Sequence, residues 1–215
     1  MRVMPWLCLV LLSSAVAHAD SSSTVSTEAV PRETVVGLAV NPMDWGSVML
    51  EGERVVGPHV SVGLGLLVGV HVSNGNNDVG PLGPRLETRD STFQVGIVPR
   101  ARFFLSGAAP EGLWVSPQLE VIHRWQRYEQ FVVEDQGNES SIRSLQLGGA
   151  ALVGYTAILG QGLAVQAGVG AGFRHSSDRY ENRQQVLPDG ERNTSTKGRS
   201  WTFDERLHIS LGWAF

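Results

Sequence analysis

Charged side chains two positions apart stand in three otherwise small or apolar stretches of this 215-residue sequence. These pairs are Glu51 with Glu53, Arg100 with Arg102, and Arg206 with His208. Residues two apart point to the same face of a β-strand, so each pair would present its charges together. Acids and bases held face to face form ion pairs, and a connected set can pass protons. The chemistry to consider is therefore charge pairing or proton relay inside a β-structure.

Alternation of apolar and polar residues is clearest at the C-terminus, from Trp201 to Phe215. One alternate set is apolar except for Glu205, and the other is small or polar. This period of two predicts a strand with one apolar face. The stretch from Glu205 to Phe215 has about the 9–11 residues that a tilted strand needs to cross a bilayer. Its aromatic residues fall where an interfacial girdle would lie, so the pattern predicts a lipid-facing strand.

The same alternation predicts eight strands, at residues 34–41, 47–55, 59–72, 91–106, 113–125, 142–159, 163–175 and 201–215. Connections after the second, fourth and sixth strands are short, whereas those after the third, fifth and seventh are long and charged. The long ones are residues 73–90, 126–140 and 176–198. This sorting is typical of a barrel with its long loops on one side of a membrane. We predict an all-β fold, an eight-stranded antiparallel up-and-down transmembrane barrel.

The stretch from Leu145 to Phe173 leaves a second interpretation open. It has no charged residue and is long enough for a transmembrane helix. It also contains eight glycines, several glutamines and a two-residue period, which favour two strands and a turn.

Three segments follow from composition. Residues 1–19 have the basic start, apolar run and small-residue site of a secretory signal peptide, with an N-terminal membrane anchor as the alternative. Residues 20–32 are a Ser/Thr-rich lead-in, and residues 33–215 are the barrel domain.

The single cysteine, Cys8, lies in the predicted signal, so no disulfide or thiolate metal site is expected. A net charge of −4 argues against nucleic acid as a partner, and no cofactor is predicted.

In such a barrel, one set of charged residues faces inward. It comprises Glu51, Glu53, Arg100, Arg102, Glu120, Arg124, Arg174, Arg206 and His208. The first four fall in one layer near the short turns, and Glu120 is expected opposite the two arginines of the fourth strand. An eight-stranded barrel is just wide enough for side chains to fill it. We therefore favour a solid polar plug over a gated or proton-conducting channel.

The predicted signal, the alternating strands, the Leu50–Arg54 stretch before a Gly-Pro turn and the aromatic C-terminus resemble small outer-membrane barrels of the OmpA/OmpX-like group. The resemblance implies a bacterial outer-membrane location and a structural or surface-interaction role. It also implies that the barrel-assembly machinery reads the last strand. The matching residues are Ile209, Leu211, Trp213 and Phe215.

One short segment is similar to an enzyme motif. His175-Ser-Ser-Asp178 is similar to the His-x-Ser-Asn segment of lipid A 3-O-deacylases, although Asp178 replaces the asparagine. Acyl transfer would need Ser177 as the nucleophile, His175 as the base and a carboxylate such as Glu181 to orient the imidazole. The surrounding pattern is absent, so our prediction is a non-enzyme, with a deacylase or a narrow channel as alternatives.

Basic residues are frequent in the predicted outer loops. They are Arg85, Arg89, Arg127, Arg143, Arg179, Arg183, Arg192 and Lys197. Arginine pairs well with phosphate, so membrane lipid and lipopolysaccharide are candidate partners. Solvated loop charge explains the same residues equally well. The sequence leaves the oligomeric state open.

Overall fold

The computed structural model describes residues 32–41, 46–78, 85–132, 136–186 and 190–215. The predicted signal peptide at residues 1–19 and nearly all of the lead-in lie outside the described residues.

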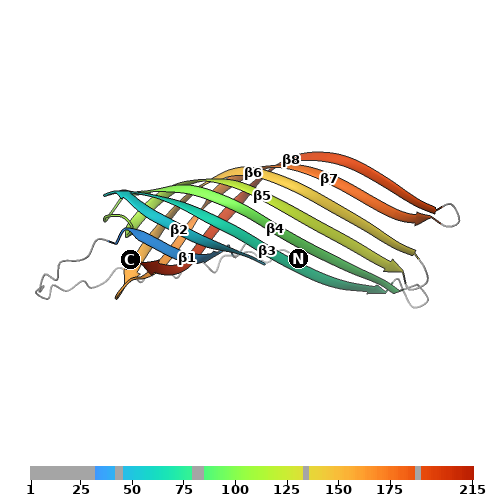
Figure 1. The fold of residues 1–215 in the computed structure, drawn as a ribbon, viewed down its shortest axis with the longest axis horizontal. Helices are drawn as coiled ribbons and strands as arrows, with labels where there is room; N and C mark the ends of the chain where they lie inside the picture. Colours follow the sequence, from blue (N-terminus) through green and yellow to red (C-terminus); the bar gives the residue numbers. More distant parts are fainter. Residues whose placement is uncertain (1–31, 42–45, 79–84, 133–135, 187–189) are drawn as a thin grey trace, which may run out of the picture. The chain divides into compact units, whose positions relative to one another are not determined.

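Eight strands form one closed barrel in which each strand pairs with the next and β8 pairs with β1 (Figure 1). They are β1 (Thr34–Val40), β2 (Ser47–Gly57), β3 (Val60–Asp78), β4 (Arg85–Phe104), β5 (Gly112–Val132), β6 (Gln136–Leu159), β7 (Leu163–Val186) and β8 (Gly190–Ala214). All neighbouring pairs are antiparallel. The predicted all-β, eight-stranded up-and-down barrel is confirmed. The stretch from Leu145 to Phe173 belongs to β6, a turn and β7, rather than to a helix.

The C-terminal residue completes the closure between β8 and β1. Val35 lies opposite Ala214, and the carbonyl of Phe215 accepts hydrogen bonds from the amides of Glu33 and Thr34, at 3.1 and 3.0 Å. These bonds satisfy backbone groups that would otherwise form a free sheet edge.

The connections from β2 to β3, from β4 to β5 and from β6 to β7 lie at one end of the barrel, which we call the short-turn end. The turn between β6 and β7 needs two residues with positive φ, and glycines supply them: Gly160 at +55° and Gly162 at +146°. A side chain would be strained in these conformations, so the glycine pair fixes a tight turn.

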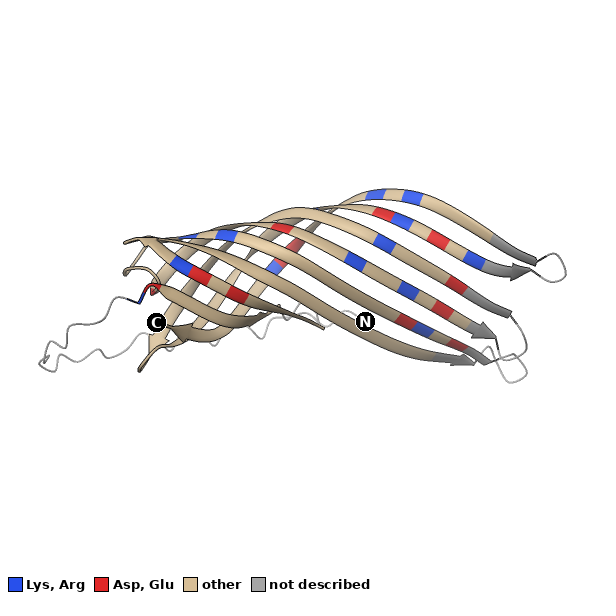
Figure 2. Ribbon diagram, in the orientation of Figure 1, with Lys and Arg blue, Asp and Glu red and all other residues tan. Residues whose placement is uncertain are grey.

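At the other end, the strands are much longer than predicted. Residues expected to form loops continue the ladder, for example Ser73 opposite Asp90 and Val186 opposite Gly190. The prediction of long loops was wrong, because Ser, Thr, Asn and Arg can pair through their backbones without an apolar face to signal a strand. We call the strand parts at this end, nearly all of them beyond the predicted strands, the extension: residues 73–78, 85–90, 126–132, 136–143, 176–186 and 190–200. Acidic and basic bands occur together on β4 to β7 in this part, whereas β8 carries only basic bands there (Figure 2).

The first two strands do not enter the extension. β1 ends at Val40 opposite Ile209, and β2 begins at Ser47 opposite Gly69. Beyond these positions β8 pairs with β7 and β3 pairs with β4. Within the described residues, the extension is therefore a six-stranded open sheet whose borders are β3 and β8.

Pro99 was expected to cause a bulge or imperfect pairing in β4. The ladder to β5 runs from Ile97 opposite Val121 to Arg100 opposite Gln118, without pairing at the two positions between. The register is unchanged across this gap. Proline, which has no amide hydrogen, interrupts the ladder here but does not insert a bulge.

The two faces of the barrel differ sharply. Large apolar side chains are exposed on the outside of every strand, including Leu38, Leu50, Leu66, Ile97, Leu119, Leu147, Val169 and Leu211. The interior buries mainly polar and charged residues. Among the described residues, no helix is long and apolar enough to cross a membrane.

Candidate functional site

The predicted inner charges near the short-turn end form buried ion pairs between β2 and β4. Arg100 Nη1 lies 2.6 Å from Glu51 Oε1, and Arg102 pairs with Glu53. The hydroxyl of Ser61 donates a further hydrogen bond to Glu53. All four charged side chains are at most 5% exposed. In this setting the pairing is essential, because an unpaired buried charge costs several kcal/mol.

Trp114 is a central residue of this layer that the sequence interpretation missed. Its side chain is fully buried, and the Arg102 guanidinium lies 4.6 Å from its ring centroid. The indole Nε1 donates a hydrogen bond of 2.9 Å to Thr156 Oγ1. Trp114 shares its strand parity with the inward residues Ser116 and Gln118, which is the signal that could have identified it.

Glycines make room for this indole. A Cβ atom at Gly154 would lie 2.4 Å from the Trp114 ring, and one at Gly168 would lie 2.6 Å from it. Phe104 and Leu152 are buried in the same cluster as Trp114. Side chains therefore fill the interior at this level.

His208 joins the two ion pairs. Its Nε2 lies 3.6 Å from Glu51 Oε1 and 3.5 Å from Arg102 Nη2. The ring also meets Trp114 edge-on, at 6.5 Å between centroids. His208 thus bridges β8 to the charges of β2 and β4.

A second charged group lies farther from the short-turn end. Glu120 Oε2 pairs with Arg206 at 2.7 Å and with Arg174 at 3.3 Å. The expectation that Glu120 faces the arginines of β4 was wrong, because the side chain reaches across the interior to β7 and β8. Asp204, which the sequence interpretation left out, lies 3.4 Å from Arg206 and 3.8 Å from Arg174. Its parity on β8, shared with Arg206 and His208, would have placed it inside.

A polar cavity of about 320 Å³ lies beyond this group, toward the extension. Its walls include Arg124, Arg174, Gln146, Ser176 and Asp178. Arg124, the remaining member of the predicted inner set, donates hydrogen bonds to Gln94 Oε1 from Nε and Nη2, at 3.1 and 2.8 Å. The inner charges therefore divide into two ion-paired groups and an arginine bordering a cavity.

The candidate catalytic residues lie on the outer face of β7. The His175 ring packs against Trp201, with 4.6 Å between ring centroids, and Ser177 is exposed. Glu181 lies 3.1 Å from Arg179. Among the described residues, no hydrogen bond joins His175 to Ser177 or to Glu181. The structure does not bring these three side chains together as a triad. No cluster of three or more potential metal ligands occurs in the described part of the chain.

The aromatic end of the chain faces outward. Ile209, Leu211, Trp213 and Phe215 are all exposed, and they form one alternate row on the outside of β8. Glu205 is also exposed on this face, between Phe203 and Leu207.

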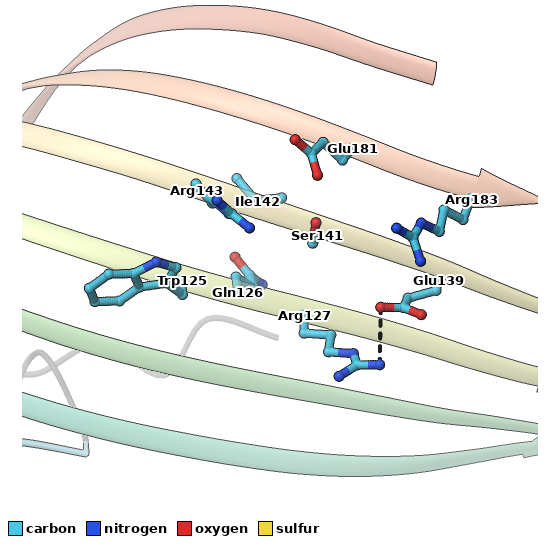
Figure 3. A pocket seen from close by; sticks show the side chains of 9 residues that line it. All are labelled: Trp125, Gln126, Arg127, Glu139, Ser141, Ile142, Arg143, Glu181 and Arg183. Atoms are coloured by element: carbon cyan, nitrogen blue, oxygen red, sulfur yellow. Dashed lines mark ion pairs between the residues drawn. The ribbon is translucent and has the colours of Figure 1, made fainter. Parts of the chain in front are cut away.

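The basic residues expected in outer loops lie on the strands of the extension instead. A hollow of about 300 Å³ lies on the outer face of the extension. Figure 3 shows residues that line it, including Arg127, Glu139, Arg143, Glu181 and Arg183. Arg127 forms ion pairs with Glu139 at 3.0 Å and with Glu129 at 2.8 Å. The hollow thus combines basic and acidic side chains from β5, β6 and β7.

Comparison with known protein families finds no match, and no curated protein matches the sequence. Among solved structures, the chain is similar to the crystal structure of CarO from Acinetobacter baumannii. The two share 12% sequence identity with a TM-score of 0.41, over 86% of this chain and 98% of CarO.

Proposed function

We propose that this chain is a bacterial outer-membrane β-barrel protein with a structural or surface-interaction role, whose interior is closed by a plug of charged side chains. A closed ladder with an apolar outer face suits a bilayer, where every backbone polar group needs a partner within the protein. The OmpA/OmpX-like resemblance of the sequence points the same way.

The buried layer around Trp114 and Arg102 supports the plug most directly. Trp114, Arg102, Ser61, Ser116 and Thr156 are all less than 2% exposed, although they lie inside the barrel. Water or solute crossing this level would have to displace them and break the ion pairs to Glu51 and Glu53.

The membrane location is tested by cell fractionation and by gel mobility. The full chain, expressed in a Gram-negative host, should be recovered from the outer membrane, and it should migrate faster unboiled than boiled. Recovery in a soluble fraction, or identical mobility before and after boiling, contradicts the barrel in a membrane.

A narrow channel is the second candidate, and the polar cavity beside Arg124 and Arg174 favours it. Planar-bilayer recordings separate the two roles. The plug predicts no reproducible unitary currents from the folded protein, whereas Arg102→Ala should allow some by opening the buried layer. Unitary currents from the unmodified protein that change in Glu120→Gln would replace the plug with a channel.

We also propose that the barrel-assembly machinery recognises the last strand. Its outward aromatic row ends at Phe215, whose backbone closes the sheet against Glu33 and Thr34. Replacing Phe215 with Ala keeps those backbone bonds and removes the ring. Assembly into the outer membrane should then slow in cells, while refolding of purified protein into detergent should change little. Equal slowing in both settings would assign Phe215 a purely structural role.

A further inference from the structure

One row of the ladder changes character as it passes around the barrel. On β3, β4 and β5 it carries Val70, Phe93 and Trp125. Val70 pairs with Phe93 across β3 and β4, and Phe93 pairs with Trp125 across β4 and β5. On β6, β7 and β8 the same row continues as Arg143, Arg179 and Lys197. The change from apolar to basic occurs between β5 and β6.

The stagger of the strands explains this change. From Val68 on β3, pairing through β4 to β7 reaches Arg199 on β8. Pairing in the other direction, through β2 and β1, reaches Ile209 on the same strand. A row therefore climbs toward the extension as it passes from β3 to β8. In a membrane, it would leave the apolar zone near Trp125 and reach headgroup level at the three cations.

The cations form a cross-strand stack of like charge. Side chains directly opposite in an antiparallel pair have Cβ atoms about 5 Å apart, and like charges there are destabilising. Glu181 offsets Arg179, with 3.1 Å between the charged groups. Among the described residues, no carboxylate forms an ion pair with Arg143 or Lys197. The stack retains unbalanced positive charge.

An apolar and aromatic row lies two outward rows below the stack, toward the short-turn end. The next outward row toward the short-turn end carries Leu145, Ser177 and Arg199, and the one after it carries Leu147, His175 and Trp201. Strand residues are about 3.3 Å apart along the chain. Arg143 therefore lies two residues from Leu145, and all three cations lie four residues, about 13 Å along the strands, from the row of Leu147, His175 and Trp201. This is the depth at which lipid phosphates meet a protein.

Two hollows lined by members of the stack give room for a headgroup. One, of about 460 Å³, is lined by Ser177, Asp178, Arg179, Lys197, Gly198 and Arg199. The other is the hollow in Figure 3, where Arg143 and Arg183 lie with Glu181. Adjacent strands are about 4.8 Å apart, so the three cations span about 10 Å.

We propose that Arg143, Arg179 and Lys197 bind the phosphate groups of a bisphosphorylated glycolipid of the lipid A type in the leaflet around the extension. Phosphate would supply the negative charge that the stack lacks, and arginine can hold it through paired hydrogen bonds. The span of the three cations suits a headgroup with two phosphates better than one with a single phosphate. This inference rests on the proposed membrane location.

Purified, folded full-length protein in neutral detergent is titrated with bisphosphorylated lipid A, and bound lipid is counted by native mass spectrometry. The test variant is Arg143→Gln with Lys197→Gln. The control is Arg54→Gln with Arg89→Gln, which removes two exposed charges elsewhere on the outer face. The test variant should bind about tenfold or more weakly, and the control should bind like the unmodified protein. Binding of dephosphorylated lipid A should resemble that of the test variant.

Equal affinity in the two variants, equal binding of dephosphorylated lipid A, or no binding by the unmodified protein overturns the proposal. Displacement of lipid by millimolar inorganic phosphate would assign the site to soluble phosphate and also overturn it. Gel mobility before and after boiling is recorded for every sample. A protein that lacks the heat-dependent shift contradicts the proposed membrane barrel, whereas a shifted protein without lipid binding contradicts this inference alone.

Discussion

The short-turn half of the barrel and the extension share β3 to β8 but place their ion pairs on opposite faces. In the short-turn half, Arg102 and Glu53 pair inside and Leu211 faces out. In the extension, Arg127 and Glu139 pair on the outside, and the inner face borders a polar cavity. The same two-residue period thus serves both regions, with the ion pairs inside in one and outside in the other.

This difference determines how much an ion pair matters. The side chains of Arg102 and Glu53 are 1% and 4% exposed, whereas those of Arg127 and Glu139 are 56% and 40% exposed. A buried charge that loses its partner stays desolvated, but an exposed one is rehydrated by solvent. Equivalent substitutions in the two regions should therefore differ several-fold in their cost.

The largest effect is expected from Glu53→Gln, which leaves Arg102 buried without its carboxylate. The free energy of unfolding, measured by urea titration in lipid vesicles, should fall by about 3 kcal/mol or more. The double variant Glu53→Leu with Arg102→Met should recover much of this loss, because neither buried charge remains. A loss below about 1 kcal/mol for the single variant would remove the contrast between the two regions.

Gly168→Ala should have the next largest effect, because the added Cβ would lie 2.6 Å from the Trp114 ring. Overpacking of this kind costs about 1–3 kcal/mol. Shifted tryptophan emission together with a lower unfolding free energy would show that the indole has moved. Gly52→Ala is the control, because its Cβ would meet nothing within 4 Å. Equal losses in both variants would contradict tight packing at Trp114.

Glu205→Leu tests the apolar outer face with a substitution that is expected to stabilise the barrel. Glu205 is an exposed acid between Phe203 and Leu207. If this row faces lipid, as proposed, replacing its charge should stabilise the barrel by about 1 kcal/mol. Urea titration in vesicles measures the change. Glu181→Leu, on the outer face of the extension, should give no such gain. A destabilised Glu205→Leu barrel would mean that this part of β8 faces water.

Arg127→Gln should change the unfolding free energy by less than about 0.5 kcal/mol, although it removes two ion pairs. Any effect should shrink when the salt concentration is raised, because exposed charges are screened. A salt-independent loss comparable to that of Glu53→Gln would show that the extension is as desolvated as the barrel interior.

Ser177→Ala is expected to have no effect on lipid A acylation or on stability. Ser177 is exposed on the outer face, without a hydrogen bond to His175. Mass spectrometry of lipid A from cells expressing the protein checks this. Loss of an acyl chain that depends on Ser177 would restore the deacylase alternative.

The sequence predicted the strands and their faces well where one face is apolar. It failed in the extension, where residues such as Ser73 and Asp90 pair through backbone groups alone. Polar strands of this kind have no period in hydrophobicity to distinguish them from loops.

The sequence predicted which residues point into the barrel, but it did not predict which of them form ion pairs with one another. Parity placed Arg102 and Glu120 inside, yet it could not show that Glu120 reaches across the barrel to Arg206. Long side chains span several strands, so their partners depend on the stagger of the whole sheet. The stack of Arg143, Arg179 and Lys197 likewise becomes visible only once the register is known.

The shortness of β1 and β2 has a consequence for contacts with other chains. Beyond His208, the border of β8 opposite β7 has no neighbouring strand in the described part of the chain, so its outward amides and carbonyls have no strand partner there. An extended peptide of another molecule can dock along such a border by main-chain hydrogen bonding. Lys197 and the small Gly198 stand on this border, and features of this kind discourage indiscriminate stacking of one sheet against the next. The borders of β3 and β8 in the extension are therefore the part of this sheet where another strand can pair, and Lys197 disfavours pairing with a second copy of the chain.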